Sequence, residues 1–350
     1  MVNPGLTTEQ VIQAAKSFVE HGSISAAASA LKLHPSTLQN RIRQARMQGY
    51  LTPDNFLASP SPFEAAPLPS EIRSAEEIKE ARRKEYKRRK NARSARKLID
   101  VKIKLDGPIG ILHMGDPHID DPGADIETLE RHCAIINETE GLFGGNVGDS
   151  HNNWIGRLGH LYGEQEVTKA EAWVLVEDFI SSVDWLYLVG GNHDVWSGAG
   201  DPLLWITRNQ SGVYENHGAR LALKFPNGAE VRVHTRHDFQ GHSMWNTAHG
   251  VSKAAQQGWR DQILICGHKH TTGYNILKDP ASGLVSHAIR VAGYKIFDRY
   301  AEQLGLPDHN VSPAVVTIID PDLPDDHPGQ VTVFHDVERG AEFLNMLRGQ

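Results

Sequence analysis

The apolar and polar positions divide the chain into a short helical region, a polar region and a long region of alternating strands and helices. Within residues 7–50 apolar side chains recur at helical spacing. Thr7 begins a capping-box pattern, Gly22 and Gly49 stand where helices should end, and Pro35 stands where one should begin. The pattern therefore predicts three short helices.

From residue 99 onward, short apolar runs predict strands and longer amphipathic stretches predict helices at 125–140 and 164–181. After residue 212 the strand signals dominate. The sequence therefore predicts an α/β fold with a β-rich second half. The expected strands are 99–105, 109–114, 142–147, 185–189, 219–225, 230–235, 263–266, 285–291, 315–319 and 331–334.

The polar region predicts a linker followed by a helix. Five prolines between residues 52 and 70 predict a semi-extended linker. Residues 71–98 hold twelve lysines and arginines, five glutamates, and no proline or glycine, with opposite charges at helical spacing. Two interpretations of this basic helix remain open, contact with a phosphate backbone and a solvated spacer. We expect three parts, at 1–50, 51–98 and 99–350.

Charge is unevenly distributed between these parts. The net charge of −7 combines +8 over residues 1–98, from 17 basic and 9 acidic residues, with −15 over residues 99–350, from 19 and 34. This asymmetry favours a basic arm that meets a polyanion and an acidic body that concentrates cations. A charged helix that is merely solvated, attached to an acidic domain, is the alternative.

Several features indicate a cytoplasmic protein. Cys133 and Cys266 are the only cysteines, so we expect no disulfide framework. No apolar run reaches about 18 residues, and the N-terminus lacks the pattern of a secretory signal, so we expect no membrane partner. The oligomeric state is left open.

Within 22–43 an Ala-rich helix, a tight break and a polar helix follow one another. This arrangement resembles the helix-turn-helix of bacterial transcription factors and phage proteins, which implies DNA binding through the third helix. A three-helix bundle for protein contacts is the alternative, and we favour nucleic acid. The exposed DNA-binding face would comprise Ser36, Thr37, Gln39, Asn40, Arg41 and Arg43.

Four polar motifs directly follow predicted strands. They are Gly-Asp-Pro-His at 115–118, Gly-Asp at 148–149, Gly-Asn-His-Asp at 191–194 and Gly-His-Lys-His at 267–270. Aspartate, asparagine and histidine are ligands of first-row divalent metals. Four such motifs at strand ends predict a metal site that activates phosphoester cleavage.

The spacing and chemistry of these side chains suggest which of them bind metal. Asp116 and His118 are two residues apart, so they share one face of an extended segment. A carboxylate with an imidazole suits Mn, Fe or Zn better than Ca, and manganese is the metal we favour. Asp149 can bridge two metals through its two oxygens, and Asn192 can bind one through its carbonyl oxygen.

Residues next to these expected ligands are candidates for catalytic, orienting or substrate-binding roles. His193 points away from Asn192 and is free for catalysis, while Asp194 can fix the orientation of a nearby histidine. Asn152 and His151 are candidates for contact with substrate.

Histidines complete the expected ligand set. His268 and His270 share one face after a buried strand. One further ligand is expected, and His237, at a strand end, is favoured over His234 within the strand. His242 and His249 are weaker candidates, suited to loop stabilisation or substrate contact.

These residues resemble the calcineurin-like metallophosphoesterase family, over roughly residues 109–300. The resemblance implies a β-sandwich flanked by helices and a dinuclear centre. The first metal would be held by Asp116, His118, Asp149 and His270, and the second by Asp149, Asn192, His237 and His268. Asn152 departs from the family pattern, since many members have aspartate there.

We therefore expect a phosphodiesterase that depends on two divalent metal ions and acts as a DNA-processing nuclease of phage or prophage type. His193 would stabilise the transition state or protonate the leaving alkoxide. Two alternatives remain, a small-molecule or protein phosphatase with a docking module, and a DNA-binding factor whose metal domain is structural.

Overall fold

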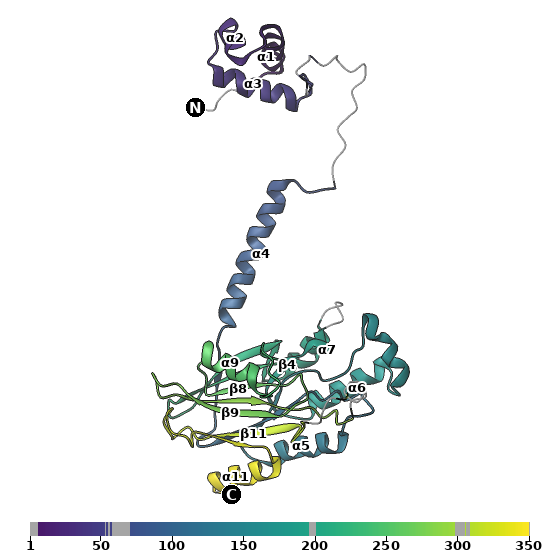
Figure 1. The fold of residues 1–350 in the computed structure, drawn as a ribbon, viewed down its shortest axis with the longest axis vertical. Helices are drawn as coiled ribbons and strands as arrows, with labels where there is room; N and C mark the ends of the chain where they lie inside the picture. Colours follow the sequence, from purple (N-terminus) through teal and green to yellow (C-terminus); the bar gives the residue numbers. More distant parts are fainter. Residues whose placement is uncertain are drawn as a thin grey trace. The chain divides into compact units, whose positions relative to one another are not determined.

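A computed structural model describes residues 6–52, 54, 57, 71–195, 201–297, 305 and 309–349 (Figure 1). The described residues form two compact units, divided between Lys79 and Glu80. No helix in these described ranges is long and apolar enough to cross a membrane.

The N-terminal unit contains the three predicted helices, α1 (Thr8–His21), α2 (Ile24–Ala30) and α3 (Pro35–Met47). Thr7 caps α1 through a capping box, and Gly22 ends it in the left-handed conformation. Alanines of α1 and α2 pack against Leu38 and Ile42 of α3. Small side chains at this interface allow three short helices to share one core.

The predicted basic helix is also present, as α4 (Ala75–Ala95). None of its residues is buried. Ion pairs at helical spacing line it, for example between Glu85 and Arg89 at 2.6 Å. Such solvent-exposed pairs add little to stability.

The C-terminal unit holds two six-stranded mixed sheets flanked by helices, so the α/β prediction is confirmed at this level. The first sheet has the order β12-β11-β2-β3-β4-β5, in which β2 to β5 run parallel. Its strands are β2 (Ile109–Met114), β3 (Leu142–Asn146), β4 (Trp185–Gly190), β5 (Val213–Asn216), β11 (Ala314–Ile319) and β12 (Val331–Phe334).

The second sheet has the order β1-β6-β7-β8-β10-β9, with β7, β8 and β10 parallel. Its strands are β1 (Ile99–Lys102), β6 (Gly218–Lys224), β7 (Glu230–Arg236), β8 (Ile263–Cys266), β9 (Gly273–Lys278) and β10 (Val285–Arg290).

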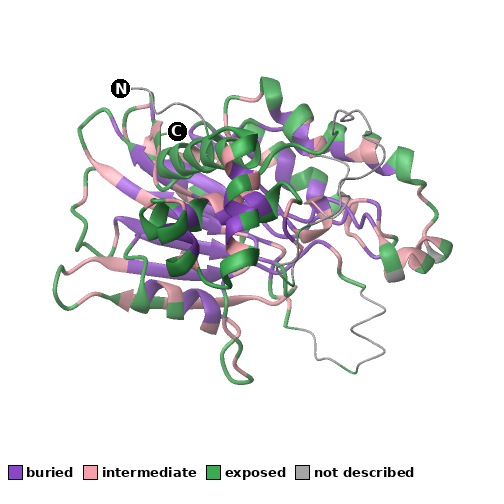
Figure 2. Ribbon diagram, turned by 90° about the horizontal axis from the view of Figure 1, so that it is seen from above, coloured by how far each residue is buried: buried purple, intermediate pink, exposed green. Residues whose placement is uncertain are grey.

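The two sheets pack face to face. One apolar core joins alternate residues of both, such as Ile109 and Ile111 of β2 with Val231 and Val233 of β7. The other face of the first sheet is covered by α5 (Ile126–Glu138), α6 (Lys169–Ser181) and α11 (Val337–Arg348). Helix α9 (His249–Gln257) covers the second sheet. Figure 2 shows the buried residues concentrated on the strands and the exposed ones on outward helix faces.

Shorter elements lie in the connections. They are the 3₁₀ helices η1 (Gly156–Glu164) and η2 (Thr207–Asn209), and the helices α7 (Asn192–Val195) and α8 (Pro202–Ile206).

Several boundaries and elements differ from the sequence predictions. The helix expected from residue 164 begins at Lys169, because Thr168 and Glu171 form a capping box there. The strand expected at 99–105 ends at Lys102. Strands β5 and β9 and helices α9 and α11 were not predicted. In α11 the apolar residues Val337, Ala341 and Leu344 do recur at helical spacing, so its signal was present in the sequence.

Candidate metal centre

Strand ends from both sheets meet at this site. Strands β2, β3 and β4 run parallel, so their carboxyl ends share one edge of the first sheet. Asp116 and His118 follow β2, Asp149 follows β3 and Asn192 follows β4. In the second sheet the parallel strands β7 and β8 end just before His237 and before His268 and His270.

One group of donors surrounds the Nε2 atom of His237. Asn192 Oδ1 lies 2.8 Å from it, Asp149 Oδ2 3.0 Å and His268 Nδ1 3.0 Å. Donor atoms that share one ion each lie about 2.1 Å from it, and therefore roughly 3 Å from one another. These four side chains have the spacing of a ligand set.

A second group of donors also lies near Asp149. The Nε2 atoms of His118 and His193 lie 4.0 Å and 3.9 Å from Asp149 Oδ2. The rings of His118 and His270 are 5.1 Å apart, and His270 Nε2 lies 3.6 Å from Asp116 Oδ2. Asp149 Oδ2 is thus close to donor atoms of both groups.

The predicted ligands have unusual backbone conformations. Positive φ values occur at His118 (41°), Asp149 (53°), His268 (70°) and His270 (49°), none of which is glycine. Such conformations are uncommon outside glycine and cost about 1–3 kcal/mol each when strained. Four at one site indicate that the surrounding fold holds these turns in place.

Two glycines allow the turns to pass close to other groups. A Cβ atom on Gly191 would lie 2.2 Å from Asp149 Oδ1, and one on Gly115 would lie 1.7 Å from the Ala292 carbonyl oxygen. Any other residue at these positions would displace the Asp149 carboxylate or the turn before Asp116.

The electrostatics favour a bound cation. Burial raises the pKa of Asp116 to about 8, and the nearby Asp149 carboxylate adds to the rise. Burial also opposes ionisation of Asp149, but the His237 and His193 imidazoles hold its pKa well below the usual range. Burial alone would lower the pKa of His237, yet Asp149 and Asp116 raise it to about 10. Two buried carboxylates therefore converge beside the His237 imidazole, and a metal ion bound there would balance their negative charge.

The donor chemistry fits first-row divalent metals. His118, Asp149 and His193 form one group that could hold an ion, and Asp149, His237 and His268 form another. In each group the donor atoms lie within 4.8 Å of one another. Asp116 Oδ1 is buried and has no hydrogen-bond partner among the described residues, as expected of an atom placed to bind an ion. The residues present thus fit the predicted metal cofactor.

His193 is positioned by the loop that follows β3. Its Nδ1 atom hydrogen-bonds to the Asn152 carbonyl oxygen, which can only accept, so Nδ1 carries the proton. Asn153 donates to the His193 carbonyl oxygen at 2.8 Å, and the His193 amide donates to Asp149 Oδ1 at 2.9 Å. This hydrogen bond fixes the ring so that Nε2, 3.9 Å from Asp149 Oδ2, is the nitrogen directed toward the donor groups.

Asp194 was predicted to orient a histidine, but its carboxylate instead holds backbone amides. It accepts hydrogen bonds from Gly191 and Asp149 at 2.8 Å and from Ser150 at 3.0 Å. The nearby imidazole nitrogen, Nε2 of His151, is 3.9 Å away. Asp194 thus stabilises the two ligand-bearing turns.

The predicted substrate residues are both buried. His151 packs on Trp173, with ring centroids 4.3 Å apart. The Asn152 side chain donates through Nδ2 to Asp121 Oδ2 at 2.8 Å, and its backbone N–H donates to Asp120 Oδ1 at 2.7 Å. The side-chain oxygen of Asn152 is buried without a partner among the described residues.

The structure separates the competing histidines. His237 lies among the ligands, whereas His234 packs against Phe239 and Trp259, with ring centroids 5.0 Å away in each case. His249 begins α9, and His242 lies in the loop before it, outside both donor groups.

The predicted DNA-binding residues lie on α3. Ser36, Thr37, Gln39, Asn40 and Arg43 are exposed, while Arg41 is half-buried. The apolar side of the helix faces the core through Leu38, Ile42 and Ala45.

Sequence reasoning missed Arg290, a fully buried arginine behind the site. It donates to the carbonyl oxygens of Thr247 and Gly267 and to Asp238 Oδ1. The bond to Gly267 holds the turn that carries His268. An arginine between the apolar residues Ile289 and Val291 was the signal that could have revealed it.

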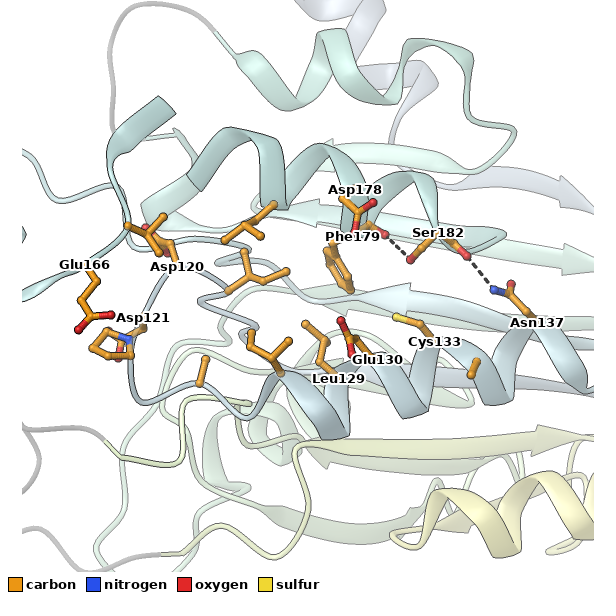
Figure 3. Close-up of a pocket in the computed structure, with 17 residues that line it drawn as sticks. Asp120, Asp121, Leu129, Glu130, Cys133, Asn137, Glu166, Asp178, Phe179 and Ser182 are labelled. Carbon is orange, nitrogen blue, oxygen red and sulfur yellow. Dashed lines mark hydrogen bonds between the residues drawn. The ribbon is translucent and has the colours of Figure 1, made fainter. Parts of the chain in front are cut away.

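Also missed were Asp120 and Asp121, which lie beside a cavity of about 580 Å³ between α5 and α6 (Figure 3). Its walls are mainly apolar, and Glu130, Glu166 and Asp178 add carboxylates. The hydrogen bond from Asn137 to the Ser182 carbonyl oxygen spans one end. None of the predicted metal ligands lines this cavity, so it is separate from the metal centre.

Comparison with models of known protein families gives no match, and comparison with curated proteins gives none either.

Proposed function

We propose that this protein is a phosphodiesterase that depends on two divalent metal ions. The proposal is supported above all by Asp149, whose Oδ2 atom lies 4.0 Å from His118 Nε2 and 3.0 Å from His237 Nε2, and these histidines are proposed ligands of different ions. A carboxylate shared by two ions is typical of dinuclear hydrolytic sites. We further propose that the C-terminal unit has the calcineurin-like fold.

The protein groups would each have a defined task. Asp116, His118, Asp149 and His270 would hold one ion, and Asp149, Asn192, His237 and His268 the other. Two such ions supply an activated water nucleophile and neutralise charge on the phosphate. His193, held by the Asn152 carbonyl oxygen, would give a proton to the leaving alkoxide. The chemistry requires no serine or cysteine nucleophile.

We propose nucleic acid, and DNA in particular, as the substrate. The excess positive charge over residues 1–98 suits a polyanion, and polar and basic side chains line the exposed side of α3. We propose that α2 and α3 form a helix-turn-helix and that α3 enters the major groove.

A substrate panel tests the proposal. Full-length protein loaded with Mn²⁺ is assayed on bis-p-nitrophenyl phosphate, single- and double-stranded DNA, RNA and nucleotides. The Asp149→Asn variant is the control, since it keeps the shape of the side chain but removes the bridging charge. We expect metal-dependent cleavage of the diester and of DNA, and its loss in the variant.

Two outcomes would favour other functions. Cleavage of phosphomonoesters alone would indicate a phosphatase with a docking module. No hydrolysis by the metal-loaded protein would indicate a structural metal domain.

A further inference from the structure

Trp154 is a large aromatic side chain that lies beside two polar side chains, His193 and Lys295. It is half-buried beside the metal centre, and its ring centroid lies 5.2 Å from that of His193, edge to face. It does not belong to the apolar cores formed by the described residues, although Trp173 and Trp185 do. Core packing therefore does not account for a tryptophan at this position.

A cation lies over the same ring. The Lys295 ammonium is 5.5 Å from the Trp154 ring centroid and 3.0 Å from Asp121 Oδ2. Asp121 in turn accepts from Asn152, whose carbonyl oxygen holds His193. The side chains of Lys295 and Asp121 are only 10% and 11% exposed, so this network is largely screened from bulk water.

The backbone beside the ring is also fixed. Asn153, directly before Trp154, has a positive φ of 39° and donates to the His193 carbonyl oxygen. Lys295 forms an isolated β-bridge with Ala124. The tryptophan is thus held in place on the segment that positions the catalytic histidine, and a surface fixed in advance loses little entropy when it binds a ligand.

We propose that Trp154 is a stacking surface for an unpaired nucleobase next to the scissile phosphate, and that Lys295 and Asp121 are its positioning residues. This inference rests on the proposed function and narrows its substrate class. A base within a duplex is already stacked on both faces, whereas one in a single strand or at a frayed end can stack on a protein ring. The site therefore prefers phosphodiesters flanked by an unpaired base.

A matched pair of substrates isolates the base. Methyl p-nitrophenyl phosphate and thymidine 5′-(p-nitrophenyl phosphate) share a leaving group and differ in the retained group. Base stacking on an aromatic side chain is worth roughly 5- to 150-fold in affinity. We expect Trp154→Ala to lower kcat/KM for the thymidine ester by such a factor more than it lowers kcat/KM for the methyl ester, mainly through KM.

Three further variants sharpen the test. Trp154→Phe should retain most of the preference for the thymidine ester over the methyl ester, because phenylalanine keeps an aromatic face. Lys295→Met should lower the preference partly. Trp205→Ala, which removes an exposed tryptophan that packs on Arg208, should leave it unchanged. Single-stranded DNA and RNA oligomers compared with duplexes then show which strand type gains from the stacking surface.

A binding measurement separates this inference from the proposed function. Titration of the metal-loaded protein with thymidine 5′-monophosphate should quench tryptophan fluorescence in wild type more than in Trp154→Phe. Quenching without hydrolysis of either ester would end the proposed function but retain the stacking surface. The stacking role would be overturned if Trp154→Ala lowered kcat/KM equally for both esters. Equal fluorescence quenching in wild type and Trp154→Phe would also overturn it.

Discussion

Replacing Arg290 by methionine should destabilise the body and weaken the metal centre together. The guanidinium is fully buried, and it pairs with Asp238 Oδ1 at 2.9 Å while donating to the Thr247 and Gly267 carbonyl oxygens. Removing one partner of a buried ion pair costs about 3–5 kcal/mol. Asp238 is 28% exposed and can be solvated, which favours the lower part of this range, but two carbonyl oxygens lose a donor at about 1 kcal/mol each.

We therefore expect Arg290→Met to lower the free energy of unfolding by roughly 3–5 kcal/mol, a fall in Tm of about 10 °C for a unit of this size. The Gly267 turn also loses its anchor, so Mn²⁺ affinity should fall by about 10- to 100-fold, as for other groups that support metal ligands. Urea unfolding and calorimetric titration with Mn²⁺ measure the two effects. Asp238→Asn is the matched control for the metal effect. It leaves the buried guanidinium without its counter-charge and should also cost about 3–5 kcal/mol, but Gly267 keeps its donor, so Mn²⁺ affinity should change less. An Arg290→Met protein within about 1 kcal/mol of wild type, with unchanged metal affinity, would refute this reasoning.

Other perturbations probe separate parts of the molecule. His193→Ala should keep its metal content while turnover falls by about 10²–10⁴, as measured by elemental analysis and by hydrolysis of DNA, whose alkoxide leaving group needs a proton; loss of an ion would instead make His193 a ligand. Burial lowers the pKa of His113, between Tyr187 and Thr317, to about 3, so the unfolded chain binds the proton more readily. Neutral His113 makes its full contribution to the free energy of unfolding above about pH 6.5. Below that pH this contribution falls by about 1.4 kcal/mol per pH unit. His113→Gln should flatten the pH dependence of urea unfolding by that slope between pH 6.5 and 4.5 in the presence of a chelator; parallel curves would argue against a buried neutral imidazole. Arg43→Ala should weaken DNA binding and reduce the dependence of log K on log salt by about 0.9, with Lys32→Ala as the control on the preceding turn; an unchanged slope would mean that Arg43 touches no phosphate.

Much of the fold could be predicted from local patterns in the sequence. Apolar runs such as Ile109–Met114 identified the central strands, because strands buried on both faces are apolar throughout. Capping residues identified α1, which begins at the capping box of Thr7 and Gln10 and ends at Gly22. Helix α9 was missed because its serine, glutamines and lysine lower its hydrophobicity, and only tertiary packing on β8 and β10 defines its buried side.

The candidate site could be predicted in part, because several of its residues directly follow predicted strands. Asp116, Asp149, Asn192 and His268 each follow a strand, so the sequence placed them at sheet edges, and the structure brings these edges together. The roles of Asp194 and Arg290 depend on contacts with segments distant in sequence. Arg290 reaches Thr247, which is 43 residues away, and Asp194 reaches Asp149, which is 45 away. No local spacing rule encodes such contacts.

The most direct measurement is the number and magnetic coupling of the ions bound by each chain. Two Mn²⁺ ions that share a carboxylate lie about 3.5–4 Å apart. Electron paramagnetic resonance of protein loaded with Mn²⁺ should therefore show a spin-coupled pair and two ions per chain, and Asp149→Asn should abolish the coupling. A single ion, two uncoupled ions, or active protein with no bound transition metal would contradict a dinuclear centre built around Asp149.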